Sequence, residues 1–523
     1  MSKLSLQGFV DECEREQLHH AQAIQPFGVL LGGYAGDPCI RYVSANVTDW
    51  LQVAPDAVLG QPLTALIPDF PPEHPDVSPN RADVWMNTAP DKTLYPYLLN
   101  SVTHGGLDGL LSCTDTHWLL ELEQSLPFNQ RHDAYRPIPH RFYRMPYSED
   151  EWQRHCQLLT DELRTISGFD RVMLYRFRGD DCGEVINESS IPEALSYSGL
   201  RFPASDIPRI ARSLYLKNRH RQISDVNAVP VPILGQNGGI TDLTLSDLRA
   251  VSPVHLQYLR NMEVTASASF PLVLSGRLWG LLACHHNSPR LLPLPVRERC
   301  ADLAQVFTLA IAGYQNSRRL FEVSGSDHEI AQLLDLLHGA ESDHGGAMRT
   351  LLSKSLLALV NADGAALVDN GSITTFGLTP DVAAIQAQLD WLTAEITDPV
   401  FVTDSLPQVF PPAAAYAERA SGLLAIRANY FIGKQRCERV FLWWRPEQPQ
   451  VVYWAGDPRK STILESQSQT LSPRSSFASW VETTAGHCEP WRDSDLLRAK
   501  KFRNLVLRAI NADLLHESRR WDP

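Results

Sequence analysis

Long apolar runs, paired cysteines and an excess of positive charge are all missing from this 523-residue sequence. Its first residues, MSKLSLQGFVDECERE, lack the basic start and apolar stretch of a signal peptide, and no later run approaches the roughly 20 apolar residues that span a bilayer. The nine cysteines form no CxxC pair, and their odd number argues against a disulfide framework. We therefore expect a cytoplasmic protein with reduced thiols and no membrane partner.

The charge balance argues against a further class of partner. The formal net charge is -13, and no concentrated Lys/Arg tract overrides it locally, so a phosphate backbone would be repelled. We expect no nucleic-acid partner. Hydrophobic residues make up 44% and charged residues 20% of the chain, values typical of packed globular proteins. At roughly 150 residues per domain, the length predicts about three or four domains.

The order of apolar runs and turn residues predicts an α/β (α+β) fold of three tandem domains with central antiparallel sheets. Residues 24–125 alternate short apolar runs with Gly, Pro and Asp turns, which is typical of a sheet with short helices. A helix-like segment, DEWQRHCQLLTDELRTISG, opens the second domain, and two strands, ASASFPLVL and LWGLLACHH, close it around an SGR turn. A long helix then leads into residues 327–489, where the helix-then-strand order repeats.

The last segment, 496–523, is predicted to be a linker helix. Leu507, Ile510, Leu514 and Trp521 follow one seam at three- and four-residue spacing. A dimerising coiled coil and a terminal helix packed on its own domain both fit this pattern.

Two segments of the second domain carry candidate binding residues. In RFPASDIP, prolines on either side of Asp206 fix the backbone, although as pure structure the segment is only a helix start with Asp as the N-cap. The segment SPVHLQY contributes His255. Arg221 and Arg249 lie near enough in sequence to join one site, and two arginines suit paired carboxylates or phosphates.

The run Cys284, His285, His286 raises two other possibilities. The three side chains are potential zinc ligands, but adjacent residues of a strand point to opposite faces and cannot readily share one ion. A Cys–His nucleophile is the second possibility, yet no oxyanion-hole signature or Asn/Asp partner is visible. We predict no metal site and no catalytic residue in this chain.

The motifs RFPASDIP, SPVHLQYLRNM, LWGLLACHH, WAGDP, SPRSSF and WVE resemble, in this order, the landmarks of bacterial phytochromes. The resemblance covers nearly the whole chain and implies a red/far-red photoreceptor that binds a linear tetrapyrrole. It implies an N-terminal extension (1–23), a PAS domain (24–130), a chromophore-holding GAF domain (138–318) and a PHY domain (319–495). A hairpin of the PHY domain, the tongue, would span about 451–485 and reach back to the chromophore.

The resemblance also implies the chromophore and its attachment. In bacterial phytochromes a Cys ahead of the PAS domain forms a thioether to biliverdin IXα, and Cys13 lies at the matching place, although it is also readable as an ordinary exposed thiol. Plant and many cyanobacterial relatives attach a reduced bilin through a Cys just before the pocket histidine. Here Val254 precedes His255, which favours biliverdin.

Roles for the pocket residues follow from the same resemblance. Asp206, through its backbone carbonyl, and His255 would hold the pyrrole rings, and His285 would contact the D-ring carbonyl. Arg221 and Arg249 would bind the two propionates. The further implied contacts are Ser252, Ser267 and Ser269 beside the propionates, Tyr175, Tyr197, Phe202 and Tyr258 around the D ring, Ile207 and Pro208 beside Asp206, and Tyr215 as a hydrogen-bond partner of Asp206.

The implied signalling residues lie in the tongue. Arg474 would form a salt bridge with Asp206 in one state, and Ser476 would replace it after the tongue refolds from hairpin toward helix. Trp454 and Trp480 belong to the same element. The sequence departs from the family pattern at Phe27, in the segment QLHHAQA and at Ala455.

We expect the chain to continue into an output domain, because no histidine-kinase phosphoacceptor segment or Gly-rich nucleotide box precedes Pro523. Its last residues, RRWDP, resemble the opening of diguanylate cyclase domains, which would use GTP and Mg²⁺ and require a parallel homodimer. A sensor for a histidine kinase remains open, as does a bilin or haem binder without signalling.

Overall fold

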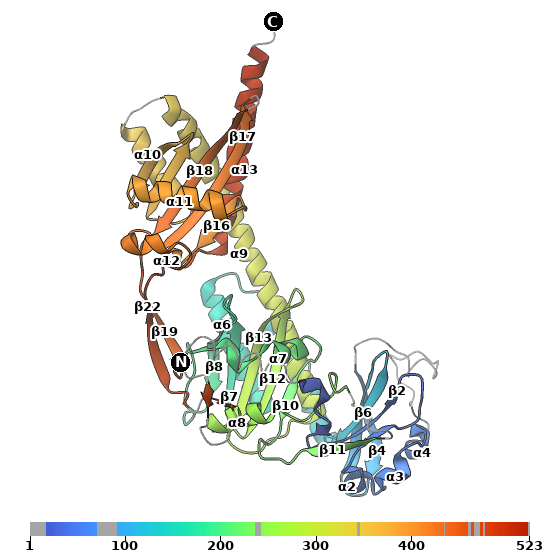
Figure 1. The fold of residues 1–523 in the computed structure, drawn as a ribbon. Helices are drawn as coiled ribbons and strands as arrows, with labels where there is room; N and C mark the ends of the chain where they lie inside the picture. Colours follow the sequence, from blue (N-terminus) through green and yellow to red (C-terminus); the bar gives the residue numbers. More distant parts are fainter. Residues whose placement is uncertain are drawn as a thin grey trace. The chain divides into compact units, whose positions relative to one another are not determined.

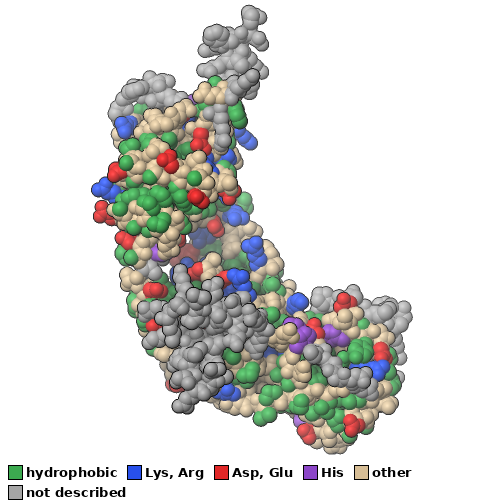
Figure 2. All heavy atoms as spheres, viewed as in Figure 1, with side chains coloured by type: hydrophobic (Ala, Val, Ile, Leu, Met, Phe, Trp, Pro, Cys, Tyr) green, Lys and Arg blue, Asp and Glu red, His purple; other side chains and the backbone are tan. Residues whose placement is uncertain are grey.

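The computed structural model describes residues 17–68, 70, 92–235, 242–342, 346–432, 435–458, 462–464, 471–473 and 476–520 (Figure 1). Cys13 and Arg474 lie outside these ranges. The chain divides into two compact units, one of residues 1–314 and 453–480 and the other of residues 315–452 and 481–523. Among the described residues, no helix combines the length and apolar character needed to cross a bilayer. On the face shown in Figure 2, Lys and Arg side chains are interspersed with Asp and Glu.

The first sheet has seven antiparallel strands in the order β1-β11-β3-β2-β6-β5-β4. Its buried face packs on short helices through Val29, Leu31, Trp118 and Leu120, which confirms the predicted sheet with short helices. The strands are β1 (Ala23–Ile24), β2 (Gly28–Tyr34), β3 (Tyr42–Ser44), β4 (Thr93–Ser101), β5 (Gly105–Cys113), β6 (His117–Gln124) and β11 (Val231–Gly235). The helices are η1 (Leu18–His20), α2 (Val47–Leu51), α3 (Pro55–Val58) and α4 (Leu63–Leu66).

Strand β11 joins this sheet from far along the chain. Ile24 pairs with Val231 on one side and forms a bridge with Arg249 on the other. The Gln25 N–H donates to the Leu248 carbonyl at 2.7 Å. Residues 23–25 therefore pass between two parts of the 231–250 segment. Phe27, one of the departures from the family pattern, is buried beside this crossing.

The second sheet begins with six strands in the order β10-β12-β13-β7-β8-β9. One face packs on α6 (Glu149–Ser167) and the start of α9 (Leu294–Ser342), and the other face carries α7 (Arg209–Tyr215) and α8 (Pro253–Asn261). The strands are β7 (Arg171–Phe177), β8 (Gly183–Ser190), β9 (Arg201–Phe202), β10 (Arg221–Ile223), β12 (Ala266–Leu274) and β13 (Arg277–His286). The shorter helices of this region are α5 (Phe128–Ala134), η3 (His140–Tyr143) and η4 (Ala204–Asp206).

Local signals account for two elements of the second domain. Helix α6 starts where the Ser148 side chain accepts the Glu151 N–H at 3.2 Å, and it ends at Gly168, whose φ of 63° is left-handed. Strands β12 and β13 meet at Ser275 and Gly276, with φ values of 50° and 74°. Positive φ at both central residues is typical of the primed hairpin turns, which match the twist of the flanking strands. The predicted helix and hairpin are both confirmed.

The second unit is built on a five-stranded sheet in the order β15-β14-β18-β17-β16. One face packs on α10, α13 and the later part of α9, and the other on α11 and α12. The strands are β14 (Gly364–Asp369), β15 (Ser372–Gly377), β16 (Val400–Thr403), β17 (Gly422–Ile432) and β18 (Gln435–Arg445). The helices are α10 (Gly346–Leu359), α11 (Val382–Glu395), α12 (Leu406–Val409), η6 (Pro411–Tyr416) and α13 (Asp493–Arg520).

The terminal helix α13 uses part of its predicted seam within its own domain. Leu507 and Ile510 pack against the core that contains Phe441, Trp443 and Phe502. For these two positions the interpretation as a terminal helix packed on its own domain holds. The helix begins at Asp493, three residues before the predicted linker.

Four short strands make up the tongue region: β19 (Gln450–Ala455), β20 (Thr462–Leu464), β21 (Leu471–Pro473) and β22 (Ser479–Thr484). Strand β19 extends the second sheet, where Trp454 pairs with Arg201 of β9 in parallel. The Gly456 N–H donates to the Ala478 carbonyl at 2.9 Å. Strands β20 and β21 form a separate antiparallel pair.

Candidate functional site

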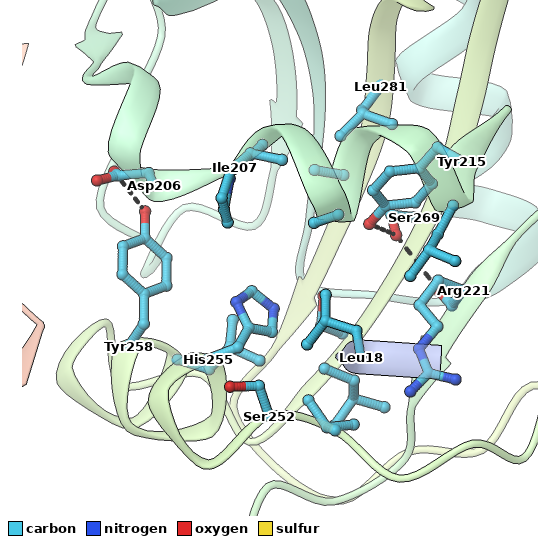
Figure 3. A pocket seen from close by; sticks show the side chains of 18 of the residues that line it. Leu18, Asp206, Ile207, Tyr215, Arg221, Ser252, His255, Tyr258, Ser269 and Leu281 are labelled. Atoms are coloured by element: carbon cyan, nitrogen blue, oxygen red, sulfur yellow. Dashed lines mark hydrogen bonds between the residues drawn. The ribbon is translucent and has the colours of Figure 1, made fainter. Parts of the chain in front are cut away.

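A cavity lies between the second sheet and helices α7 and α8 (Figure 3). Its walls follow the alternation of the strands. On β13, Leu281 and His285 line the cavity, whereas Leu282 and Cys284 point into the core on the other face. The predicted binding residues that line this one cavity are Tyr175, Phe202, Asp206, Ile207, Pro208, Tyr215, Arg221, Arg249, Ser252, His255, Tyr258, Ser267, Ser269 and His285.

Asp206 lies between Pro203 and Pro208, the two prolines that were predicted to fix its backbone. It ends η4, and Pro208 rather than Asp206 occupies the N-cap position of α7. The helix-cap interpretation of Asp206 is therefore wrong. Its carboxylate instead accepts a hydrogen bond of 2.9 Å from the Tyr258 hydroxyl.

The predicted hydrogen bond between Tyr215 and Asp206 is wrong. The Tyr215 hydroxyl lies 2.7 Å from the Ser269 hydroxyl, at the opposite end of α7 from Asp206 (Figure 3). The reason is the length of α7, which carries Tyr215 to its last turn and over strand β12. Tyr258 takes the place at Asp206 that the sequence analysis gave to Tyr215.

Two arginines bring buried positive charge to the same end of the cavity. Arg221 donates to the backbone carbonyls of Asp247 and Ala250, each at 3.2 Å, and Arg249 donates to that of Leu243 at 3.2 Å. In the described part of the chain, neither guanidinium forms an ion pair with a carboxylate. Burial, with the charge of Arg249, lowers the pKa of Arg221 to about 9. Two neighbouring cations that form no direct ion pair with a described carboxylate are suited to an anionic ligand with two acidic groups.

Two neutral imidazoles line the middle of the cavity. Burial and the nearby Arg221 charge lower the pKa of His255 to about 4, and burial, Arg171 and His255 lower that of His285 to about 3. A neutral imidazole offers one donor and one acceptor. The His285 Nδ1 atom is buried and has no hydrogen-bond partner among the described residues, so it is available to a polar group of a ligand.

Aromatic rings close the cavity opposite the arginines. The Tyr175 and Phe202 ring centroids lie 5.8 Å apart, and Tyr258 meets Phe477 of the tongue region edge to face at 5.1 Å. Tyr197 is not on the wall of this cavity. It packs behind Phe202 at 5.8 Å, with the Arg171 guanidinium over its ring. Tyr197 therefore supports Phe202 from behind the cavity wall and does not line the cavity as predicted.

The cavity also contains a residue that sequence reasoning missed. Leu18 of η1 lines it, together with residues more than 150 positions further along the chain. The Leu243 N–H donates to the His19 carbonyl at 2.8 Å and anchors this segment. No local signal marks Leu18, because its place depends on the crossing of residues 23–25 through the 231–250 segment.

The two alternative chemistries lack the necessary geometry. Cys284 and His285 face opposite sides of the sheet, and burial raises the pKa of the Cys284 thiol, so a reactive Cys–His pair is not formed. His286 lies 2.8 Å from the Asp170 carboxylate, away from Cys284. Within the described ranges, no group of three or more His, Cys, Asp or Glu side chains is arranged to hold a metal ion.

Comparison with known proteins identifies the family. Models described as "PAS fold", "GAF domain" and "Phytochrome region" match residues 13–74, 151–313 and 330–514. A bacteriophytochrome of Xanthomonas campestris is 31% identical, with 95% of this chain matched to 78% of that protein. The chain belongs to the phytochrome family. Cyanobacterial phytochrome B of Nostoc is 32% identical over 95% of this chain.

Solved structures agree with this assignment. The crystal structure of a bacteriophytochrome from R. palustris matches with a TM-score of 0.79 at 32% identity, covering 96% of this chain and 99% of that one. The photosensory core module of a Stigmatella aurantiaca phytochrome matches with a TM-score of 0.78 over 96% of this chain. This phytochrome chain is thus a red/far-red photosensory module with the predicted PAS–GAF–PHY order. It spans 66% of the length of the Nostoc phytochrome.

Proposed function

We propose that this phytochrome module binds biliverdin IXα in the GAF cavity through a thioether to Cys13. The observation that carries the proposal is a pair of guanidiniums, Arg249 buried and Arg221 half-buried, which form no ion pair with a carboxylate of the described chain and lie at one end of an apolar cavity. A bilin with two propionates matches that charge. Bound biliverdin supplies absorption of red and far-red light and a double bond that isomerises.

Different residues of the chain would then bind different parts of biliverdin. Arg221 and Arg249 would bind the propionates, with Ser252, Ser267 and Ser269 as further donors. Asp206, through its backbone carbonyl, and His255 would accept hydrogen bonds from the pyrrole N–H groups. His285 would donate to the D-ring carbonyl, for which its buried and unpartnered Nδ1 is support. Tyr175, Phe202 and Tyr258 would form the walls, and Tyr197 would support Phe202.

The tongue would transmit the state of the pocket. Phe477 packs on Tyr258, and Tyr258 donates to Asp206, so the tongue contacts the hydrogen-bond network of the cavity. We propose that Arg474 pairs with Asp206 in one state and that Ser476 replaces it in the other, with Trp454 and Trp480 in the element that refolds. The described residues include Ser476, which is exposed.

Replacing Cys13 by Ser tests the attachment. We expect the wild-type chain, loaded with biliverdin and denatured in acid, to retain pigment on the protein band, and Cys13→Ser to lose it because serine forms no thioether. Non-covalent binding before denaturation should survive in the variant, since the cavity is unchanged. The matched control is Cys39→Ser, which should retain pigment. Pigment retained by Cys13→Ser would contradict the assignment.

For the output we propose a diguanylate cyclase joined to α13, acting as a parallel homodimer in the cytoplasm. The support is the RRWDP end of the sequence, and such a domain would bring the need for GTP and Mg²⁺. The full-length protein should make cyclic di-GMP from GTP at rates that differ under red and far-red light. Autophosphorylation from ATP without cyclic di-GMP would instead favour a histidine kinase.

A further inference from the structure

Charged residues, most of them buried, gather where the PAS domain meets the 243–250 segment of the GAF domain. The PAS domain contributes Glu121 and Glu123 of β6, with Lys92 just before β4. Asp247 lies in the segment itself, and the remaining members are His220, Arg297 and Glu298. The pocket arginine Arg249 is two residues from Asp247, so this cluster borders the proposed propionate end of the cavity.

Glu121 accepts hydrogen bonds from three successive residues of this segment, two through their backbone N–H groups and one through its side-chain hydroxyl. Its Oε1 atom accepts the Leu248 N–H at 2.9 Å and the Ser246 hydroxyl, and its Oε2 atom accepts the Asp247 N–H at 3.0 Å. The Glu121 side chain is 1% exposed. All the donors come from one turn, which the carboxylate holds from the PAS side.

The other side of the same turn holds the pocket arginine. The Asp247 carbonyl accepts from Arg221 at 3.2 Å, and the Arg249 and Ala250 carbonyls accept from the same guanidinium. Residue Asp247 is therefore hydrogen-bonded to Glu121 through its N–H and to Arg221 through its C=O. The Glu121 carboxylate and the Arg221 guanidinium are thus linked through a single residue, Asp247.

Among the described residues, no cation forms an ion pair with Glu121, because the neighbouring cations pair with other carboxylates. Lys92 pairs with Asp247, and Arg297 binds Glu123 through two hydrogen bonds of 2.5 and 2.9 Å. His220 lies 3.5 Å from Asp247 and 3.2 Å from Glu298. Burial, reinforced by the charge of Asp247, raises the pKa of Glu121 to about 7.

We propose that Glu121 is a positioning residue: it fixes the 246–248 turn and thereby sets the position of Arg221 in the chromophore cavity. This inference rests on the proposed bilin function. Protonated Glu121 would present an O–H to the N–H and hydroxyl donors of the turn, so the turn loosens as the pH falls. The PAS domain thus contributes to the pocket through a hydrogen-bonded turn, while the N-terminal extension contributes Leu18 to the cavity wall.

The first test needs no pigment. In Glu121→Gln, an NH₂ group replaces one of the two accepting oxygens, so hydrogen exchange at the Asp247 or Leu248 amide that faces it should be faster by about tenfold, the size expected for losing a hydrogen bond to a charged group. The matched control is Glu123→Gln, a buried carboxylate on the same strand that binds Arg297 and not the turn. Unchanged exchange in Glu121→Gln, or equal acceleration in both variants, would overturn the inference whether or not biliverdin binds.

The second test measures the association rate of biliverdin from about pH 6 to about pH 8, the range around the shifted pKa. We expect the wild-type rate to rise with pH as Glu121 ionises and the turn orders. Glu121→Gln should be slower and lose this dependence, whereas Glu123→Gln should keep it. The same pH profile in Glu121→Gln as in the wild type would overturn the inference. Absence of pigment binding in the wild type would instead overturn the proposed function.

Discussion

We expect biliverdin to bind at least about 30-fold more weakly to Arg221→Ala than to the unaltered chain, because removing one partner of a buried ion pair costs about 2 kcal/mol or more. In the free protein, Arg221 is held by backbone carbonyls at the edge of the cavity, with Arg249 nearby. Loss of the guanidinium leaves a propionate buried without its counter-charge. A titration of biliverdin followed by absorbance gives the dissociation constants when both chains also carry Cys13→Ser, so that no thioether forms.

Two further variants distinguish the effect of the Arg221 charge from the effect of its planar geometry and from a general loss of stability. Arg221→Lys keeps the charge but not the planar fork, so its affinity should lie between those of the wild type and Arg221→Ala. Arg260→Ala removes a cation of α8 that donates to Asn227 and Val226 and does not line the cavity, so it should bind like the wild type. An Arg221→Ala dissociation constant within about twofold of the wild-type value would show that the arginine does not meet a ligand carboxylate.

Gly183→Ala should reduce the yield of photoconversion several-fold by moving the Tyr175 ring. A Cβ atom on Gly183 would lie 1.7 Å from the Tyr175 hydroxyl oxygen and Cζ, so the ring must leave its place. The backbone of Tyr175 lies close to the neighbouring strand β13, since a Cβ atom on Gly280 would lie 2.3 Å from the Tyr175 carbonyl oxygen. The ring can yield only by repacking against the cavity wall, and overpacking of this kind typically costs about 1–3 kcal/mol.

The control for this change is Gly179→Ala, where an added Cβ meets no atom within 4 Å. Red/far-red difference spectra at matched pigment loading measure the yield in each variant. Adding Tyr175→Ala to Gly183→Ala removes the clash, so thermal stability should partly recover even if the spectrum does not. Gly183→Ala with wild-type spectra and yield would contradict the role given to the Tyr175 ring.

The parts of the fold that sequence reasoning predicted are those with local causes. Helix α6 follows from its Ser148 cap, its apolar spacing and Gly168, and the β12–β13 hairpin follows from two alternating strands around Ser275 and Gly276. The position of β11 in the first sheet has no such signal, because pairing between residues about 200 positions apart depends on how the chain crosses itself. The seam of α13 shows a similar limit, since spacing alone does not tell whether a partner helix or the domain's own sheet covers it.

The residues of the candidate site likewise fall into those that were predicted and those that were not. Most of the residues that the resemblance implied line one cavity, although their spacing in the sequence alone does not bring them together. The roles that the resemblance implied for Tyr215 and Tyr197 were wrong. Tyr215 reaches Ser269 because of the length of α7, and Tyr197 stands behind Phe202. Glu121 has no motif around it, and its role emerges only from three hydrogen bonds to a turn of another domain.

We propose that this cavity holds a bilin that switches between two light-absorbing states. The most direct test is the difference spectrum of the biliverdin-loaded chain after alternating saturating red and far-red light. We expect two absorption bands that exchange intensity reversibly over repeated cycles. A pigment that binds but gives no reversible red/far-red difference would contradict photoconversion and leave a bilin or haem binder without signalling.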